Sequence, residues 1–154
     1  MSRLVRSTTE GQEALAAATA ETLLQVRGVT TQKASLAYFR LSADQEATTE
    51  IENISWRLLY QSTDGTFTGA TEVPGDPDDP TPALTMFHSS AGEPTPGTVI
   101  DEGEIPANGE TFTYLADGDG IGLDNATTSR IGLEVTASVI CNAKASWGWR
   151  IDAA

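Results

Sequence analysis

The stretch that decides the fold covers residues 130–151 and has the sequence RIGLEVTASVICNAKASWGWRI. Every odd position from 131 to 151 is apolar, and Ile140 is the only large apolar residue at the even positions between them. An alternation of period two is typical of a half-buried β-strand, because successive side chains point to opposite faces of the sheet. Globular strands mostly run roughly 3–10 residues. We therefore expect two strands here, at about 130–136 and 143–151.

These two strands are expected to be antiparallel neighbours, joined by a tight connection around residues 138–142. Four side chains at the odd positions are expected to face the core: Leu133, Val135, Trp147 and Trp149. Cys141 occupies the same apolar register and is the only cysteine, so an internal disulfide is excluded. We interpret it as a small core residue rather than a reactive thiol.

Shorter alternations predict further strands along the chain. The expected ranges are 22–26, 37–41, 54–61, 83–88, 98–105 and 111–115. The pairs Asp64-Gly65 and Asn108-Gly109 are typical of turns. Residues 73–82 are rich in proline and aspartate, which favours an exposed loop over a central strand. Residues 11–20 have a helix-favouring composition in a β context, so helix and strand both stay open there.

Length and strand spacing together predict one domain. A chain of 154 residues can bury about 68–70% of its unfolded surface. Many short strands with regular turns predict an all-β, single-domain β-sandwich or jelly-roll-like fold over residues 11–154. Residues 1–10 are polar and are expected to form a flexible N-terminal arm. No stretch approaches the ~20 apolar residues of a membrane helix, and acids interrupt the early Ala-rich segment, so neither a membrane span nor a signal peptide is expected.

The net charge of −13 is unevenly distributed along the sequence. Residues 41–124 contain 17 acids and one base, Arg57, which gives a local balance of −16. The negative electrostatic potential of this region repels nucleic acid and anionic membranes, so neither is an expected partner. The acids are either a solubilising surface or one acidic face of a molecule whose other, less acidic face meets a partner.

Catalytic motifs are absent from the sequence. The only histidine, His88, lies in a predicted strand, where a surface or core-edge position is a better interpretation than a general base. No zinc-type Cys/His cluster, nucleophile elbow, phosphate loop or dinucleotide fingerprint occurs. Glu102 and Glu104 can be nominated as a glycosidase-like carboxylate pair, but nothing in the sequence sets their separation. We expect no enzymatic activity and no cofactor.

A calcium site is a minor hypothesis for residues 117–124. Asp117, Asp119 and Asp124 offer the carboxylate oxygens that Ca²⁺ prefers, on a glycine-rich loop. The register of an EF-hand fails, because Ile121 occupies its fifth position and no glutamate closes the loop. A plain turn is therefore the better interpretation, and no metal site is expected.

Three stretches carry a resemblance to a known class of proteins. Residues 16–26 (AAATAETLLQV), 92–95 (GEPT) and 130–137 (RIGLEVTA) occur in this order. They resemble landmarks of small structural proteins in the virions of tailed bacteriophages, and the span from 16 to 149 covers most of the chain. The resemblance implies a non-enzymatic virion component attached to the capsid shell.

The expected function is that of a capsid decoration, or cement, protein made in the host cytoplasm and located on the virion surface. Its expected partner is the major capsid protein, with a homotrimer as the favoured oligomer. Arg3 and Arg6 of the N-terminal arm are the candidate capsid contacts. One alternative is a tail or head–tail junction component. Another is a carbohydrate-binding β-sandwich that displays Trp56, Trp147 or Trp149 to sugar rings.

Overall fold

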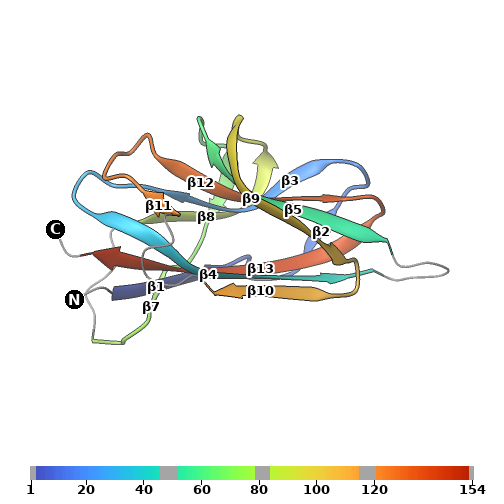
Figure 1. Cartoon of the computed structure of the whole chain (residues 1–154), viewed down its shortest axis with the longest axis horizontal. Helices are drawn as coiled ribbons and strands as arrows, with labels where there is room; N and C mark the ends of the chain where they lie inside the picture. Colours follow the sequence, from blue (N-terminus) through green and yellow to red (C-terminus); the bar gives the residue numbers. More distant parts are fainter. Residues whose placement is uncertain (1–2, 46–51, 79–83, 115–120, 153–154) are drawn as a thin grey trace.

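The computed structural model describes residues 3–45, 52–78, 84–114 and 121–152. These residues form two antiparallel β-sheets that pack face to face, and they contain no helix (Figure 1). The expectation of an all-β sandwich is confirmed. One layer has seven strands and the other has six.

The seven-stranded sheet is the lower layer of Figure 1. Its main order is β10-β4-β13-β1-β7, with β11 also paired to β4 and β2 also paired to β13. The bounds are β1 (Arg3–Thr8), β2 (Glu13–Leu15), β4 (Lys33–Asp44), β7 (Val73–Pro74), β10 (Glu110–Tyr114), β11 (Gly122–Leu123) and β13 (Cys141–Asp152).

The six-stranded sheet is the upper layer, in the order β6-β8-β3-β12-β5-β9. Its strands are β3 (Ala20–Arg27), β5 (Asn53–Gln61), β6 (Thr66–Gly69), β8 (Thr85–Gly92), β9 (Pro96–Pro106) and β12 (Arg130–Ala137). The predicted strands at 22–26, 54–61 and 98–105 lie inside β3, β5 and β9, and the one at 37–41 lies inside β4 of the other sheet.

The predicted pairing of the last two strands is wrong. β12 pairs with β3 and β5, whereas β13 pairs with β1, β2 and β4 in the opposite sheet. The short connection at 138–140 therefore crosses between the layers instead of closing a hairpin. The alternation indicates which side chains are buried. It does not indicate whether the two strands pair within one sheet or face each other from opposite sheets, because their apolar sides are buried in the same core in either case.

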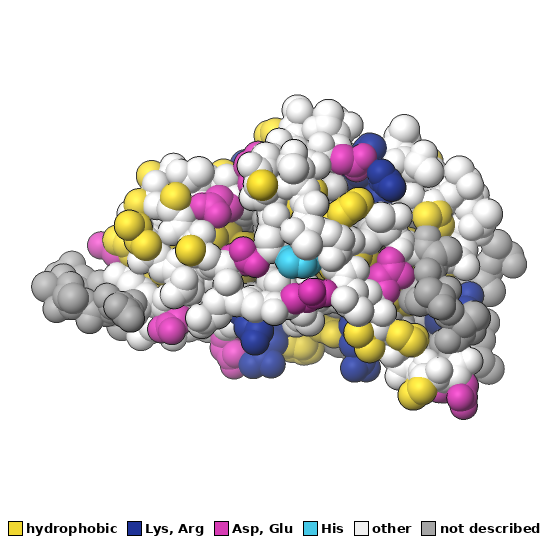
Figure 2. Space-filling view, turned by 180° about the vertical axis from the view of Figure 1, so that it is seen from behind, with side chains coloured by type: hydrophobic (Ala, Val, Ile, Leu, Met, Phe, Trp, Pro, Cys, Tyr) yellow, Lys and Arg dark blue, Asp and Glu magenta, His cyan; other side chains and the backbone are white. Residues whose placement is uncertain are grey.

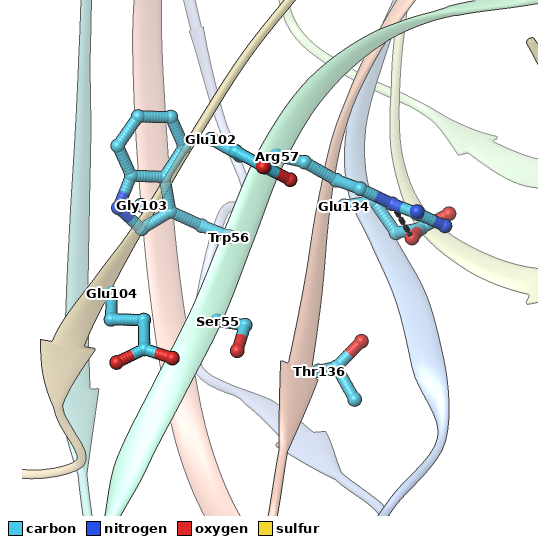
Figure 3. A pocket seen from close by; sticks show the side chains of 8 residues that line it. All are labelled: Ser55, Trp56, Arg57, Glu102, Gly103, Glu104, Glu134 and Thr136. Atoms are coloured by element: carbon cyan, nitrogen blue, oxygen red, sulfur yellow. Dashed lines mark hydrogen bonds and ion pairs between the residues drawn. The ribbon is translucent and has the colours of Figure 1, made fainter. Parts of the chain in front are cut away.

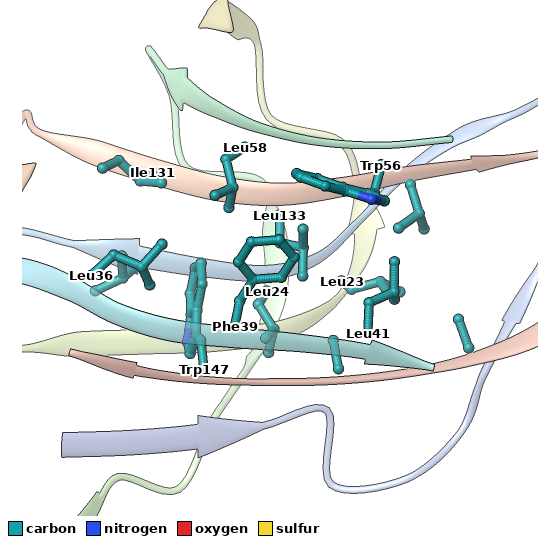
Figure 4. Close-up of a cluster of buried hydrophobic side chains, with 14 of the residues drawn as sticks. Leu23, Leu24, Leu36, Phe39, Leu41, Trp56, Leu58, Ile131, Leu133 and Trp147 are labelled. Carbon is teal, nitrogen blue, oxygen red and sulfur yellow. The ribbon is translucent and has the colours of Figure 1, made fainter. Parts of the chain in front are cut away.

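The core between the layers contains the side chains that the alternation selected. Leu133, Trp147 and Trp149 have no exposed surface, and Val135 is 1% exposed. The two tryptophan rings meet edge to face with their centroids 5.4 Å apart. Phe39 of β4 reaches across the interface to Trp56 of β5, and their ring centroids are 4.9 Å apart (Figure 4). Cys141 is buried as expected.

The expected flexible arm over residues 1–10 is wrong for residues 3–8, which form β1. This strand lies between β13 and β7, and all six of its residues are in register with β13. Val5 and Ser7 are buried, and Ser7 Oγ accepts a hydrogen bond of 2.9 Å from Trp147 Nε1. The polar composition that favoured an arm is explained by the outer face of β1 and by this buried hydroxyl. Residues 1–2 lie outside the described residues.

The structure also shows the conformation of the described residues in 11–20 and 73–82. Within 11–20 the structure has the short strand β2 and no helix. Among the described residues 73–78, β7 is the only strand, and it lies at the edge of its sheet, as a proline-containing strand requires. Residues 79–83 lie outside the described residues, as do residues 115–120, which include Asp117 and Asp119 of the candidate calcium loop.

Candidate functional site

The two outer faces of the sandwich carry different charges. Side chains that alternate with the buried residues of β1, β4, β10 and β13 point outward from the seven-stranded sheet. Five of them are bases: Arg6, Lys33, Arg40, Lys144 and Arg150. Three are acids: Asp44, Glu110 and Asp152. The outward side chains of these four strands therefore carry a formal charge of +2, on a molecule whose net charge is −13.

Figure 2 shows Lys and Arg side chains along the lower margin of the molecule, on the side of the seven-stranded sheet. The bases of the six-stranded sheet are each paired with an acid. Arg27 and Arg130 both bind Asp64, at 3.0 Å and 2.5 Å, and Arg57 binds Glu134 at 2.6 Å. Asp64 has its pKa lowered, chiefly by the hydrogen bond from Arg130. The uneven charge of the sequence thus becomes a difference between two faces.

A groove of about 530 Å³ lies on the six-stranded sheet (Figure 3). Strands β5, β9 and β12 line it with Ser55, Trp56, Arg57, Glu102, Gly103, Glu104, Glu134 and Thr136. At its floor Arg57 Nε donates to Glu134 Oε1, and Glu134 is only 4% exposed. Three carboxylates and one guanidinium make the groove acidic, with the single cation already paired.

Glu102 and Glu104 both reach this groove. They occupy successive outward positions of β9, opposite Arg57 and Ser55 in the register with β5. The two carboxylates therefore follow one another along the same edge strand, and both residues are exposed. A glycosidase pair instead needs its two carboxyl groups on either side of the bond to be cleaved. The structure brings the nominated pair together without giving it that arrangement.

The tryptophans that sugar binding would need are not displayed. Trp147 and Trp149 are fully buried, and Trp56 is 9% exposed. The ring of Trp56 lies beneath Gly103, where an added Cβ would come within 2.7 Å of the ring. Trp56 lines the groove of Figure 3, but so little of its surface is exposed that it offers no open ring face for a sugar to stack on.

His88 belongs to a chain of polar contacts between the two sheets. Its Nδ1 lies 2.5 Å from Ser89 Oγ, and the hydroxyl of Ser89 donates to Glu13 of β2. On the other side, His88 Nε2 lies 3.7 Å from Glu10 Oε2, and Thr71 N donates to Glu10 Oε1 at 2.7 Å. Glu10 has its pKa lowered, chiefly by Thr71. Figure 2 shows the histidine with an acidic side chain on each side.

The predicted core-edge position of His88 is confirmed, since it lies in β8 and is 8% exposed. The contacts around it could not be found from the sequence. Glu10 and Ser89 have positive φ angles of 58° and 56°, which only a folded context stabilises in residues other than glycine. This cluster fastens β8 to the β1–β2 segment.

A second hollow, of about 270 Å³, lies on the seven-stranded sheet. It is lined by Thr8, Arg40, Ser42, Lys144, Ala145 and Ser146. Beside it, Phe112 is 60% exposed and stacks on Tyr38, with ring centroids 5.6 Å apart. Arg6, one of the two candidate capsid contacts, is exposed on the same face. Arg3 is three residues away on β1, so the alternation directs it to the opposite side of the sheet.

The described residues contain no cluster of three or more His, Cys, Asp or Glu side chains arranged to hold a metal ion. Asp124 is the only described carboxylate of the candidate calcium loop, because Asp117 and Asp119 fall within 115–120. No helix in the described ranges has the length and apolar character needed to cross a bilayer. Comparisons with models of protein families, with curated proteins and with solved structures find no match to this chain.

Proposed function

We propose that this protein is a non-enzymatic structural component of a bacteriophage virion that decorates the assembled capsid. The observation that carries the proposal is the division of charge between the two faces of one sandwich. The strands of the seven-stranded face carry a local excess of bases and a stacked aromatic pair with Phe112 exposed, whereas the groove on the opposite face is acidic. Exposed aromatic and arginine side chains are enriched where proteins bind one another.

In this proposal the seven-stranded face binds the major capsid protein, and the acidic face points away from the shell. Arg6 takes part directly, because it is an exposed residue of that face. The arginine is presented by a paired strand and not by a flexible arm, so little conformational entropy is lost when it binds. Arg3 is directed to the other side of β1, so it is not part of the proposed contact.

The physical role follows from linkage. A protein that binds the assembled shell but not free subunits adds its binding free energy to the assembled state. Repetition over the capsid lattice turns modest individual contacts into strong retention when the sites are engaged together. A homotrimer that matches a threefold position of the shell would provide such repetition, and this remains part of the proposal.

Co-sedimentation with empty capsids of the cognate phage tests the function. The protein is expected to pellet with capsids at low salt and to be released as salt rises, because the proposed contact is largely ionic. Arg6→Gln should weaken attachment. Glu104→Gln on the acidic face is the matched control and should not weaken it. Absence of the protein from the capsid pellet at low salt would contradict the proposal, and recovery with isolated tails would favour the tail or head–tail alternative.

A further inference from the structure

We propose that the hollow between Arg40 and Lys144 is a carboxylate-binding pocket that receives an Asp or Glu side chain of the partner protein. The inference rests on the proposed function for the identity of that partner, the shell subunit. The pocket itself is a property of the seven-stranded sheet and can be tested without capsids.

The sheet register builds the pocket from two neighbouring rows of side chains. In the first row Thr8, Ser146 and Arg40 lie side by side on β1, β13 and β4. In the second row Lys144 lies beside Ser42, which lies beside Glu110 of β10. Rows two residues apart on one face are separated by about 7 Å. Arg40 and Lys144 are therefore diagonal neighbours, close enough for one carboxylate to contact both.

The chemistry of the lining suits a carboxylate. Each cation can donate charge-assisted hydrogen bonds to a carboxylate oxygen, and the hydroxyl of Ser146 can donate to the same group. The hydroxyl of Ser42 donates to the backbone carbonyl of Lys144 at 3.4 Å. Lys144 has no ion pair with any acid in the described part of the chain. Among the described residues this lysine has no acidic partner, so the hollow has a local positive charge suited to an external anion.

A carboxylate already occupies one side of this arrangement. Glu110 Oε2 lies 2.7 Å from Arg40 Nη2, and both side chains are more than half exposed. An exposed pair of this kind is weak and exchanges readily with a competing acid. Glu110 therefore acts as an internal competitor, and its removal should make the pocket bind an external carboxylate more tightly.

An acidic protein side chain fits better than a nucleic acid. The net charge of −13 repels a polyanion over its whole length, whereas a single carboxylate meets only the local positive charge. Phe112 of β10 lies opposite Arg40 and diagonally from Tyr38 of β4, on which it stacks, so this pair can cover the apolar part of a bound peptide. These two features together favour an acidic protein segment.

The test measures binding of a fluorescent hexaglutamate peptide by anisotropy at low salt, with hexaglutamine as the uncharged control. Lys144→Gln should weaken binding about fivefold, and Glu110→Gln should tighten it about twofold to threefold, as expected for single exposed charge contacts. Lys33→Gln is the matched control. It removes the same charge from the same face at the far end of β4 and should change binding by less than about twofold.

Equal weakening by Lys144→Gln and Lys33→Gln would overturn the pocket, because the effect would then come from overall charge. Equal binding of a short DNA duplex with the same variant pattern would overturn its preference for carboxylates. Far-ultraviolet circular dichroism of each variant checks that the fold is unchanged. If the peptide binds as expected but capsids do not, the pocket stands and the proposed function fails. If capsids bind normally with Lys144→Gln, the function stands and the pocket is not the contact.

Discussion

Trp149 shows how much of the stability rests on single side chains. It is fully buried and meets Trp147 edge to face. Trp149→Ala should lower the free energy of unfolding by about 3–5 kcal/mol, because it removes a large apolar side chain and leaves a cavity. Urea denaturation measures the change. Ile140→Ala is the control: Ile140 is 77% exposed, so its loss should cost no more than ~0.5 kcal/mol. Equal effects of the two substitutions would contradict the placement of Trp149.

Glu72 makes the free energy of unfolding depend on pH. Burial raises the pKa of this carboxyl to about 7. Its hydrogen bond with the backbone of Met86 lowers the pKa and so offsets part of this effect. Because the folded state holds the proton more tightly than the unfolded state, the free energy of unfolding falls as pH rises from about 4.5 to 7. The stability that protonation provides is present below this window and absent above it.

Glu72→Gln should therefore stabilise the protein at pH 8 by on the order of 1 kcal/mol, after allowance for the part of the side chain that water screens. At pH 4, where the native carboxyl is already protonated in the fold, the variant should differ little from the parent. Thermal unfolding at the two pH values measures the difference. A gain of the same size at both would show that ionisation of Glu72 is not its cause.

At the level of strands, the pairing of β5 with β9 depends on a residue without a side chain. An added Cβ at Gly103 would meet the ring of Trp56, which cannot move away because it packs against Phe39. Gly103→Ala should lower the free energy of unfolding by about 1–3 kcal/mol through overpacking. Gly69→Ala in β6 is the control, since no atom lies within 4 Å of its added Cβ. A neutral Gly103→Ala would mean that the sheet relaxes around the new methyl group.

A second prediction at the level of strands concerns β1. Deleting residues 2–10 removes the whole of β1, whose six residues pair with β13 and include the buried Val5 and Ser7. The truncated protein should lose cooperative unfolding, because an edge of β13 and part of the core become exposed. Circular dichroism during heating measures this. Arg6→Gln leaves the strand in place and should unfold at the same temperature as the parent. A stable, cooperative truncated domain would show that β1 is dispensable.

For the whole molecule, the net charge of −13 makes weak cation binding a general effect that must be separated from a specific site. We expect the thermal midpoint to be nearly the same in EDTA and in millimolar Ca²⁺, with Mg²⁺ as the control for simple screening. A specific calcium site would raise the midpoint by many degrees in Ca²⁺ alone, because a bound ion stabilises the folded state by mass action. That result would assign a ligand role to residues 117–124.

The sequence by itself determined where most strands lie and which of their side chains are buried. The odd positions of 131–151 are the clearest case, since the period of two is a local property of an extended backbone. It also indicated the absence of known catalytic motifs and the uneven charge. It missed β1, because a short polar strand with a buried serine has the composition of a tail.

Only the tertiary structure decided which strands are neighbours. Backbone hydrogen-bonding groups are the same in every strand, so the pairing of β12 with β3 and β5, and of β13 with β1 and β4, depends on contacts between residues far apart in the chain. The pairing of β13 with β4 places Arg40 beside Ser146, and the packing of the two sheets brings Glu10 to His88 and Glu13 to Ser89. The candidate surfaces are products of sheet register, and register is settled when the two layers bury their apolar faces against each other.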